Sequence, residues 1–248
     1  MKKYSYILLI AGLVIMAALI FRFFFYAVTP TQEISRQDMI PSVAVSQQNP
    51  GTMIQLPPTI VDGDMSLEKA LSERRSVRSY RQAPLNLQEV SQMLWAAQGI
   101  NNEQGFRTAP SAGATFPLDM FVMVNNVGGL AKGIYKYLPH ENQLEMIHRN
   151  DVSQELARAA LSQAMITDAG MVLIFAAVFE RTTQRYDERG IRYVYNEVGH
   201  AGQNVHLQAA ALNLGTVVIG AYRDQEVEEV LNLDEQYKVL YLMPVGKI

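Results

Sequence analysis

Cysteine is absent from all 248 residues of the chain. This absence excludes disulfide bonds, thiolate catalysis, cysteine-ligated iron–sulfur clusters and a lipidated N-terminal cysteine. The sequence also lacks the G-x-G-x-x-G and P-loop patterns, so it supports neither a Rossmann nicotinamide domain nor an ATPase. A formal net charge of -3 gives no reason to expect nucleic-acid binding. No metal site is expected, because the spacing of six between His200 and His206 places them on different faces of a helix and no carboxylate pair completes a site.

Charge is also missing from Tyr4 to Phe21, a run that follows Lys2 and Lys3. Its length fits the roughly 20 residues that cross a bilayer core. We therefore expect residues 1–28 to form a retained transmembrane anchor, with a cleavable signal peptide as the alternative. Because the basic residues closest to the run precede it, the globular part is expected on the extracytoplasmic side of the membrane.

Residues 29–55 are rich in Pro, Gln, Ser and Thr and show no sustained apolar period, which predicts an extended tether. The rest of the chain, 56–248, is long enough for one domain with a substantial core. Helices are expected after the N-cap residues Ser66 and Asn86, and over residues 153–162 and 224–231. Strands are expected at residues 120–125, 134–138, 144–147, 171–179, 216–219 and 238–243.

The segment from Tyr186 to Gly220 is the most informative stretch of the domain. From Ile191 onward its apolar residues recur at steps of three and four, which predicts a long buried helix with many small residues on its packed face. We expect Gly215 to end this helix in a left-handed conformation. The β-branched residues that follow predict a buried strand ending at Gly220, and a tight glycine turn of this kind is typical of a binding site.

Four polar side chains interrupt this helix, and they need polar partners if they are buried. They are His200, Gln203, Asn204 and His206. We interpret His200 as a core histidine with satisfied hydrogen bonds rather than as an acid–base group. Gln203 and Asn204 are candidates to contact the polar edge of a ring, with a structural hydrogen-bonding role as the alternative.

Two further clusters are candidates for ligand binding. Arg74, Arg75, Ser76 and Arg78 place three guanidiniums and a hydroxyl within five positions, a set that suits a phosphate clamp. The alternative is a solvated basic helix end. The small residues of the segment 109–117 lie between two prolines and predict a stiff loop whose backbone can approach a flat or anionic ligand. Its alternative is an ordinary loop that leads into a strand.

Several motifs, taken together and in order, resemble the SagB-type dehydrogenase branch of the nitroreductase superfamily. They are RRSVRSY, WAAQGI, RTAPSAGATFPLDMFVMV, RYDERGIRYVYNEVGHAGQNVHLQAAALNLGTVVIGAY and the terminal LYLMPVG. The resemblance covers the domain from about Leu56 to its end. It implies an α+β flavoprotein with a mixed central sheet flanked by helices. It also implies an intertwined homodimer with one FMN in each of two clefts between the subunits.

The resemblance further implies roles for individual residues. Arg74 and Ser76, with Arg75 adjoining, match positions that hold the FMN phosphate and ribityl oxygens. Arg78 matches a cation near flavin N1 and the C2 carbonyl, where it would stabilise the negative charge of the reduced flavin. The loop that reaches FMN from the partner subunit matches Pro110, Ser111 and Gly113. The turn whose backbone N–H faces flavin N5 matches Ile219 and Gly220.

The chain also departs from the superfamily pattern. General nitroreductases carry Asn and Gln at the positions of Ala114 and Phe116, and the form seen here is typical of the SagB-type branch. Many members of the superfamily have a basic residue after the last strand that contacts the FMN phosphate, and Lys247 is the one candidate for it in this chain. Azoline-oxidising relatives use a Lys-Tyr pair near Arg192 and Tyr193, and arginine is a far poorer proton acceptor than lysine.

These observations predict an FMN-dependent oxidoreductase that passes hydride through flavin N5 between a donor and an unidentified small-molecule or peptide acceptor. NAD(P)H is a candidate donor, and Tyr193 is the side chain expected to transfer a proton. The alternatives are an azoline oxidase acting on modified peptides and a flavin-binding protein without turnover.

Overall fold

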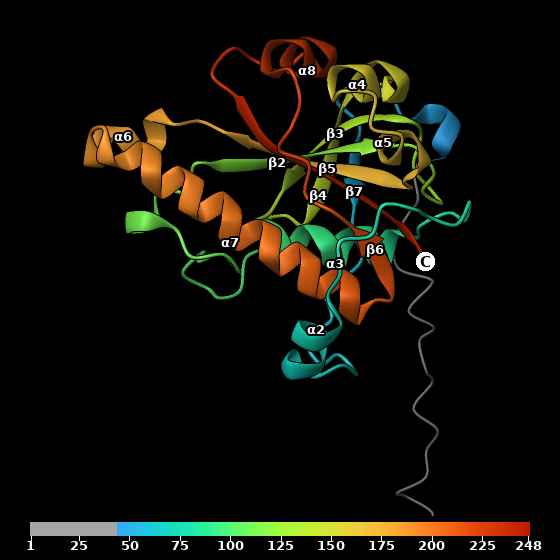
Figure 1. The fold of residues 1–248 in the computed structure, drawn as a ribbon, viewed down its shortest axis with the longest axis horizontal. Helices are drawn as coiled ribbons and strands as arrows, with labels where there is room; N and C mark the ends of the chain where they lie inside the picture. Colours follow the sequence, from blue (N-terminus) through green and yellow to red (C-terminus); the bar gives the residue numbers. More distant parts are fainter. Residues whose placement is uncertain (1–43) are drawn as a thin grey trace, which may run out of the picture. The chain divides into compact units, whose positions relative to one another are not determined.

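The computed structural model describes residues 44–248, which are drawn in colour in Figure 1. The predicted anchor over residues 1–28 lies outside the described residues. Within residues 44–248, none of the helices has both the length and the apolar content that a membrane crossing requires. The last part of the predicted tether belongs to the same compact unit as the rest of the domain. It contains the short helix η1 (Val45–Gln47) and the strand β1 (Met53–Gln55), which pairs with the domain's sheet.

One seven-stranded sheet organises the domain, in the order β1-β4-β3-β2-β5-β7-β6. Besides β1, its strands are β2 (Leu118–Val124), β3 (Gly133–Leu138), β4 (Gln143–His148), β5 (Met171–Ala177), β6 (Leu214–Thr216) and β7 (Lys238–Lys247). Every pairing between these strands is antiparallel, so the predicted mixed sheet is wrong. Short turns join β2, β3 and β4, and connections of that length can only pair strands antiparallel.

Helices cover both faces of the sheet (Figure 1). They are α2 (Leu67–Glu73), α3 (Leu87–Gln98), α4 (Ser153–Ala159), α5 (Met165–Asp168), α6 (Glu180–Tyr186), α7 (Arg189–Ala211) and α8 (Asp224–Leu231). The predicted N-caps are confirmed: the Ser66 hydroxyl accepts from the Lys69 N–H, and Asn86 forms a capping box with Glu89.

Two apolar cores lie on the two faces of the sheet. The first joins the sheet to α3 and α7, through residues such as Met93 and Val198. The second joins it to α4, α5 and α8, through residues such as Leu156 and Val227. Successive residues of a strand point to opposite faces of the sheet. Because β5 is buried on both faces, all of its residues from Met171 to Ala177 are apolar.

The end of α7 differs from the prediction. The left-handed residue after the helix is Asn213, with φ 54°, and Gly215 lies inside β6. Asparagine tolerates this conformation better than most residues. Glycine is required at 215 for a different reason, because an added Cβ would lie 2.7 Å from the Val77 side chain and 2.6 Å from that of Ile248. Of the predicted strand 216–219, Thr216 belongs to β6 and Ile219 makes an isolated bridge with Leu242.

Candidate functional site

The arginine segment, residues 74–81, lies along the edge of the sheet formed by β6 and β7. The Val77 N–H donates to the Thr216 carbonyl at 2.9 Å, and the Arg81 N–H donates to the Lys247 carbonyl at 2.9 Å. The Tyr80 hydroxyl donates to the Pro244 carbonyl at 3.2 Å. These bonds fix the backbone of the segment, so the long side chains between them project from a rigid base.

The polar side chains of this segment fall into two groups. Within the described part of the chain, the side chains of Arg74, Ser76 and Arg78 make no hydrogen bond and no ion pair. In contrast, the Arg75 guanidinium folds back and donates to the carbonyls of Ser72 and Arg74, at 3.0 and 2.8 Å. The three alternate positions therefore offer uncommitted donors, whereas Arg75 is already engaged.

A cavity of about 210 Å³ lies between this segment, the end of α7 and β6. Its lining includes Arg75, His206 and Thr216, and both His206 Nδ1 and Thr216 Oγ1 are buried without a hydrogen-bond partner. Burial, assisted by the positive charge of Arg74, lowers the pKa of His206, so its imidazole is neutral at pH 7. Two orphaned polar atoms beside a guanidinium are typical of a polar ligand site. Sequence patterns singled out His206 only as a polar residue on the helix and missed Thr216.

The predicted glycine turn lies on the same edge of the sheet. The Ile219 N–H donates to the Leu242 carbonyl at 2.8 Å, so within the predicted Ile219-Gly220 turn a ligand contact through a free N–H falls to Gly220. Gly220 is exposed, and its N–H makes no hydrogen bond among the described residues. The nearest atom to an added Cβ at Gly220 would be a ring carbon of Tyr241, 4.0 Å away. The turn thus presents one free N–H on an open surface.

The loop of residues 110–116 lies elsewhere. Pro110 and Gly113 are exposed and Ser111 is half-buried. The Arg185 guanidinium, at the end of α6, donates to the Gly113 carbonyl at 3.1 Å. The arginine segment instead contacts β6 and lies near His206, close to the opposite end of α7.

The length of α7 separates these two predicted halves of the cofactor site. The helix has 23 residues and therefore spans about 34 Å at 1.5 Å per residue. Figure 1 shows α6 at one end of it and α2, which leads into the arginine segment, near the other. The structure brings Arg74, Ser76, Arg78 and Gly220 to one edge of the sheet, and it does not bring the loop to them within one chain.

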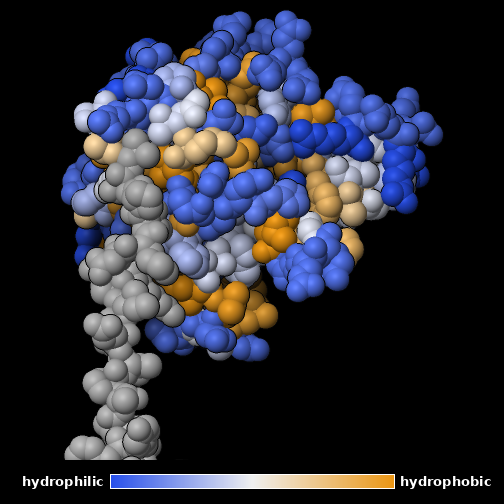
Figure 2. All heavy atoms as spheres, turned by 180° about the vertical axis from the view of Figure 1, so that it is seen from behind, coloured by the Kyte–Doolittle hydropathy of each residue, from blue (hydrophilic) through white to orange (hydrophobic). Residues whose placement is uncertain are grey.

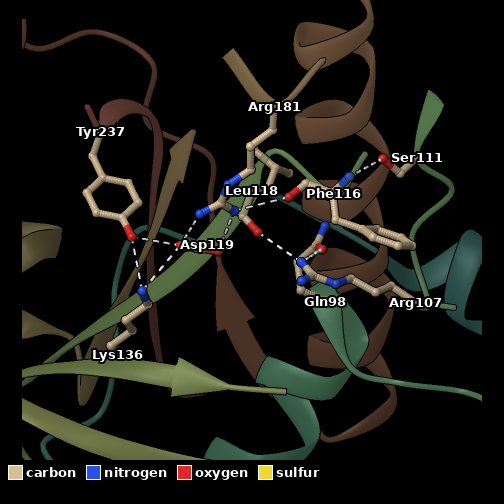
Figure 3. A network of polar contacts seen from close by, with 9 residues as sticks. All are labelled: Gln98, Arg107, Ser111, Phe116, Leu118, Asp119, Lys136, Arg181 and Tyr237. Atoms are coloured by element: carbon tan, nitrogen blue, oxygen red, sulfur yellow. Dashed lines mark hydrogen bonds and ion pairs between the residues drawn. The ribbon is translucent and has the colours of Figure 1, made fainter. Parts of the chain in front are cut away.

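An ion cluster fastens the end of the loop to the sheet (Figure 3). The Asp119 carboxylate accepts two hydrogen bonds from Arg181, at 2.9 and 3.0 Å, and one from the Tyr237 hydroxyl at 2.8 Å. The Lys136 ammonium lies 3.3 Å away. Burial alone would raise the pKa of Asp119, but the bonds from Arg181 and Tyr237 and the charge of Lys136 lower it to about 2.

A second buried polar junction lies on α7. Glu197 is 2% exposed, and its Oε1 has no hydrogen-bond partner. Burial raises its pKa to about 7 against the opposing effects of Ser111, Arg107 and Gln98, which face the carboxyl. We did not predict a role for Glu197, although the sequence holds a signal for one. It is the acidic residue among the apolar positions Val194, Val198 and Ala201 that form the buried face.

The predicted proton-transfer pair lies at the start of α7. Arg192 is exposed and lines an open groove of about 1010 Å³ at the junction of α6 and α7. Tyr193 is half-buried, and its ring packs edge-on against that of Tyr186 with centroids 5.1 Å apart. This groove is larger than the cavity beside Arg75, but it contains none of the residues of the arginine segment.

The remaining predicted residues have mixed outcomes. His200 is exposed, so the prediction of a core histidine is wrong; it lies on the outward face of α7. Gln203 is also exposed, whereas Asn204 donates its amide to the Thr108 carbonyl at 3.3 Å, which is a structural contact. The Lys247 ammonium forms an ion pair with Glu89 and is therefore not a free cation.

Apolar surface gathers around α2. Figure 2 shows hydrophobic residues at the lower edge of the molecule, where α2 lies in Figure 1. Leu67 and Leu71 are 61% and 52% exposed. An open pocket of about 350 Å³ beside them is lined by Trp95 and Leu207 among others. Exposed leucines beside an open pocket are a feature of interaction faces.

Comparison with known proteins identifies the family. The model of the nitroreductase family matches residues 71–247. The protein MJ1384 of Methanocaldococcus jannaschii, whose name places it among the nitroreductases, is 50% identical over 184 residues, which are 74% of this chain and 92% of that protein. A crystal structure of a nitroreductase-type protein from Ralstonia eutropha superposes with a TM-score of 0.68 and 26% identity, covering 81% of this chain and 93% of the other.

A third relative is McbC of Escherichia coli, named as a microcin B17-processing protein. It is 28% identical over 135 residues, which are 52% of this chain and 50% of McbC. The structure of the E. coli microcin synthetase McbBCD complex, with truncated pro-MccB17 bound, has the same fold, with a TM-score of 0.63 over 77% of this chain and 76% of the other. The family model matches most of the folded domain. The chain therefore belongs to the nitroreductase family and is an oxidoreductase.

Proposed function

We propose that this chain is an FMN-dependent oxidoreductase of the SagB-type branch and that FMN binds at the edge of the sheet formed by β6 and β7. The observation that supports it most strongly is the set of uncommitted donors at Arg74, Ser76 and Arg78, on the same edge of the sheet as the free N–H of Gly220. Guanidinium and hydroxyl donors suit a phosphate and a ribityl chain, and a bare glycine suits a flat ring.

The residues present fit the cofactor. The orphaned Nδ1 of His206 and Oγ1 of Thr216, beside Arg75, add polar groups that a bound phosphate or ribityl oxygen would satisfy. FMN would supply the transfer of hydride between donor and acceptor. The chain would contribute the positive charge of Arg78 and the N–H of Gly220, which orient the ring and stabilise negative charge on it. The ion pair between Lys247 and Glu89 argues against Lys247 as a contact to the FMN phosphate.

We further propose that the active form is a homodimer in which Pro110, Ser111 and Gly113 complete the site of the partner. Support comes from the separation of the loop and the arginine segment along α7. The apolar surface around Leu67 and Leu71 supplies area for such an interface.

Subunit complementation tests this arrangement. One full-length chain carries Arg74→Ala and another carries Gly113→Val, so each homodimer has two damaged sites. If the site is shared, mixed dimers contain one site with both lesions and one site with neither. Random exchange of equal amounts makes half of the dimers mixed, and half of the sites in those are intact, so we expect about a quarter of the wild-type FMN binding. Binding that stays at the level of the separate variants would contradict a shared site.

A turnover experiment tests the proposed activity. The purified full-length chain is loaded with FMN and mixed with NAD(P)H without oxygen while the flavin absorbance is followed. We expect the band to bleach and to return when an acceptor such as a quinone or a nitroaromatic is added. Bound FMN that no donor reduces would favour the alternative of a flavin-binding protein without turnover.

Gly220 offers a test that leaves the fold intact. Gly220→Ala adds a methyl group whose nearest neighbour is 4.0 Å away, so we expect an unchanged Tm. The same methyl would crowd the proposed ring face, and overpacking of this kind costs about 1.4 kcal/mol, which is about tenfold in the Kd for FMN. Gly63→Ala is the matched control, because an added Cβ there also meets nothing within 4 Å. Equal FMN affinity in both variants would refute the placement of the ring at Gly220.

A second candidate function is azoline oxidation on modified peptides. It is favoured by the similarity to McbC and by the open groove of about 1010 Å³ at the junction of α6 and α7, which is lined by Arg192. Tyr193 would donate or accept the proton, but Arg192 stands where those relatives use lysine. Conversion of an azoline-containing peptide to the aromatic azole, lost in Tyr193→Phe, would establish this activity.

The cellular location is also a proposal. An anchor over residues 1–28 with the domain on the extracytoplasmic side would separate the site from cytoplasmic NAD(P)H. The physiological donor would then be another reductant, such as a membrane quinol. Protease treatment of intact cells distinguishes the two sides: we expect the domain to be digested, and its protection would reverse the proposed orientation.

A further inference from the structure

The tip of the loop of residues 110–116 packs against α6 and the start of α7. An added Cβ at Gly113 would lie 2.5 Å from the Tyr186 hydroxyl oxygen, so these two residues are in close contact. The Arg185 guanidinium donates to the Gly113 carbonyl at 3.1 Å, and its Cζ lies 5.5 Å from the centroid of the Tyr186 ring. The Tyr186 ring in turn packs edge-on against that of Tyr193, with centroids 5.1 Å apart. Tyr193 therefore lies at the same end of the domain as the loop.

The hydroxyl of Tyr193 is uncommitted. Its ring is half-buried and packs against Tyr186, but the hydroxyl makes no hydrogen bond to any of residues 44–248. The open groove of about 1010 Å³ at the junction of α6 and α7 is lined by its neighbours Tyr186 and Arg192. A packed ring with a free hydroxyl, next to an open groove, suits a residue that exchanges a proton with a bound molecule.

The turn at Gly220 lies beside the middle of α7 rather than beside its start. An added Cβ at Gly220 would lie 4.0 Å from the Tyr241 ring, and an added Cβ at Gly202 would lie 3.4 Å from the same ring. Tyr241 therefore connects the turn to Gly202 of the helix. Gly202 is nine residues beyond Tyr193, which is about 14 Å at 1.5 Å per residue.

The arginine segment is farther still from Tyr193. His206, which lines the cavity together with Arg75, follows Tyr193 by thirteen residues, or about 20 Å along the helix. A general acid or base must come within about 3.2 Å of the group whose proton it transfers. Tyr193 is therefore out of reach of a reacting atom placed at Gly220 of its own chain.

A two-fold axis near the middle of α7 would remove this separation. In a symmetric dimer the same surface patch of both copies meets across the axis. Such an axis therefore brings the start of one α7 beside the end of the other. The outward face of the helix has room for it: Gly199 is exposed, and an added Cβ there meets nothing within 4 Å. His200 and Gln203 are exposed on the same helix.

We propose that Tyr193 acts at the cofactor site of the partner subunit, so that each site combines the arginine segment and Gly220 of one chain with Tyr193 and the loop of the other. This inference rests on the proposed function, because it takes FMN to bind at the edge formed by β6 and β7. An acceptor that gains a hydride from the donor also gains a proton. The Tyr193 hydroxyl supplies that proton and recovers one from water.

Complementation between subunits tests the proposal. Tyr193→Phe keeps the ring and removes only the hydroxyl, so we expect an unchanged Tm, an unchanged Kd for FMN and about 100-fold slower turnover of NAD(P)H with a quinone. Mixed dimers of Tyr193→Phe and Arg74→Ala are isolated through a different affinity tag on each chain. If Tyr193 acts across the interface, one of their two sites carries both lesions and the other carries neither. We therefore expect about half of the wild-type turnover.

A second mixture gives the opposite result and serves as the matched control. Tyr193 and Gly113 belong to the same half of the proposed site, so mixed dimers of Tyr193→Phe and Gly113→Val have one lesion in each site. We expect them to stay near the low turnover of the separate variants. A Tyr193 that served its own chain would reverse the two outcomes. That reversal, or wild-type turnover in Tyr193→Phe alone, would overturn the proposal.

A cross-link tests the same arrangement without FMN. Because the chain has no cysteine, a short bis-maleimide reacts only with thiols that are introduced. One tagged full-length chain carries Arg192→Cys and the other carries Arg78→Cys, both at exposed positions. We expect a covalent heterodimer. In the control, Arg158→Cys on α4 replaces Arg192→Cys, and we expect no covalent heterodimer above background, because α4 covers the other face of the sheet. Equal yields from the two pairs would contradict the arrangement.

The two experiments separate this inference from the proposed function. If the chain does not bind FMN but the Arg192→Cys and Arg78→Cys chains are linked, the proposed function fails and the arrangement across the interface stands. If FMN binds and turns over, but the cross-link is absent and the complementation pattern is reversed, the proposed function stands and Tyr193 acts within its own chain.

Discussion

Arg74→Ala should weaken FMN binding about 100-fold while the domain stays folded. A guanidinium that donates to a phosphate contributes up to about 3 kcal/mol, and 2.7 kcal/mol corresponds to a factor of about 100. The Arg74 side chain makes no hydrogen bond to the described part of the chain. Its removal should therefore change the free energy of unfolding by about 0.5 kcal/mol or less. Fluorescence titration of FMN and urea denaturation measure the two effects separately.

Two further substitutions define the specificity of this effect. Arg74→Lys keeps the charge but loses the paired donors, so we expect an intermediate affinity. Arg158→Ala removes an exposed arginine of α4, on the other face of the sheet, and should bind FMN as the wild type does. Equal losses in Arg74→Ala and Arg158→Ala would point to a general effect of charge rather than to a phosphate contact.

Asp119→Ala should destabilise the fold by about 3 kcal/mol, because it leaves two cations without their partner. This value lies at the low end of the range for buried pairs, since the Arg181 and Lys136 side chains are 35% and 27% exposed and can turn to water. The midpoint of urea denaturation measures the loss. Glu155→Ala breaks an exposed pair with Arg158 and should change stability by less than about 0.5 kcal/mol.

The same carboxylate predicts how stability depends on acid. The pKa of Asp119 is lowered to about 2, so its contribution is fully present above its ordinary value near 4 and disappears as pH falls toward 2. We expect the wild type to lose about 2 kcal/mol more than Asp119→Asn between pH 4.5 and 2. Identical acid profiles for the two proteins would mean that the ion cluster does not stabilise the fold.

The sequence predicted those structural features that depend on residues close together in the chain. The caps Ser66 and Asn86 depend on neighbours three positions away, and both are present as expected. The helix over residues 224–231 matches α8. Gly215 misled the prediction, because it is needed for a contact with Val77, which is distant in sequence. The antiparallel sheet was missed for a similar reason, since strand order depends on pairings between distant segments.

The candidate site was predictable in its parts but not in its arrangement. The residue types of Arg74, Ser76 and Arg78 indicated an anion clamp, and the structure leaves their side chains without partners. Nothing in the sequence indicated that Ile219 would commit its N–H to Leu242. The prediction of a core histidine at His200 was wrong, because His200 lies on the exposed face of α7, whereas Glu197 lies on its buried face.

A titration of FMN into the full-length chain tests the central claim most directly. The account predicts saturable binding of one FMN per chain, with the flavin fluorescence quenched, and loss of that binding in the double variant Arg74→Ala/Ser76→Ala. It also predicts that both proteins have the same far-UV circular dichroism. An absence of saturable binding, or binding that the double variant retains unchanged, would contradict the assignment of this edge of the sheet as the FMN site.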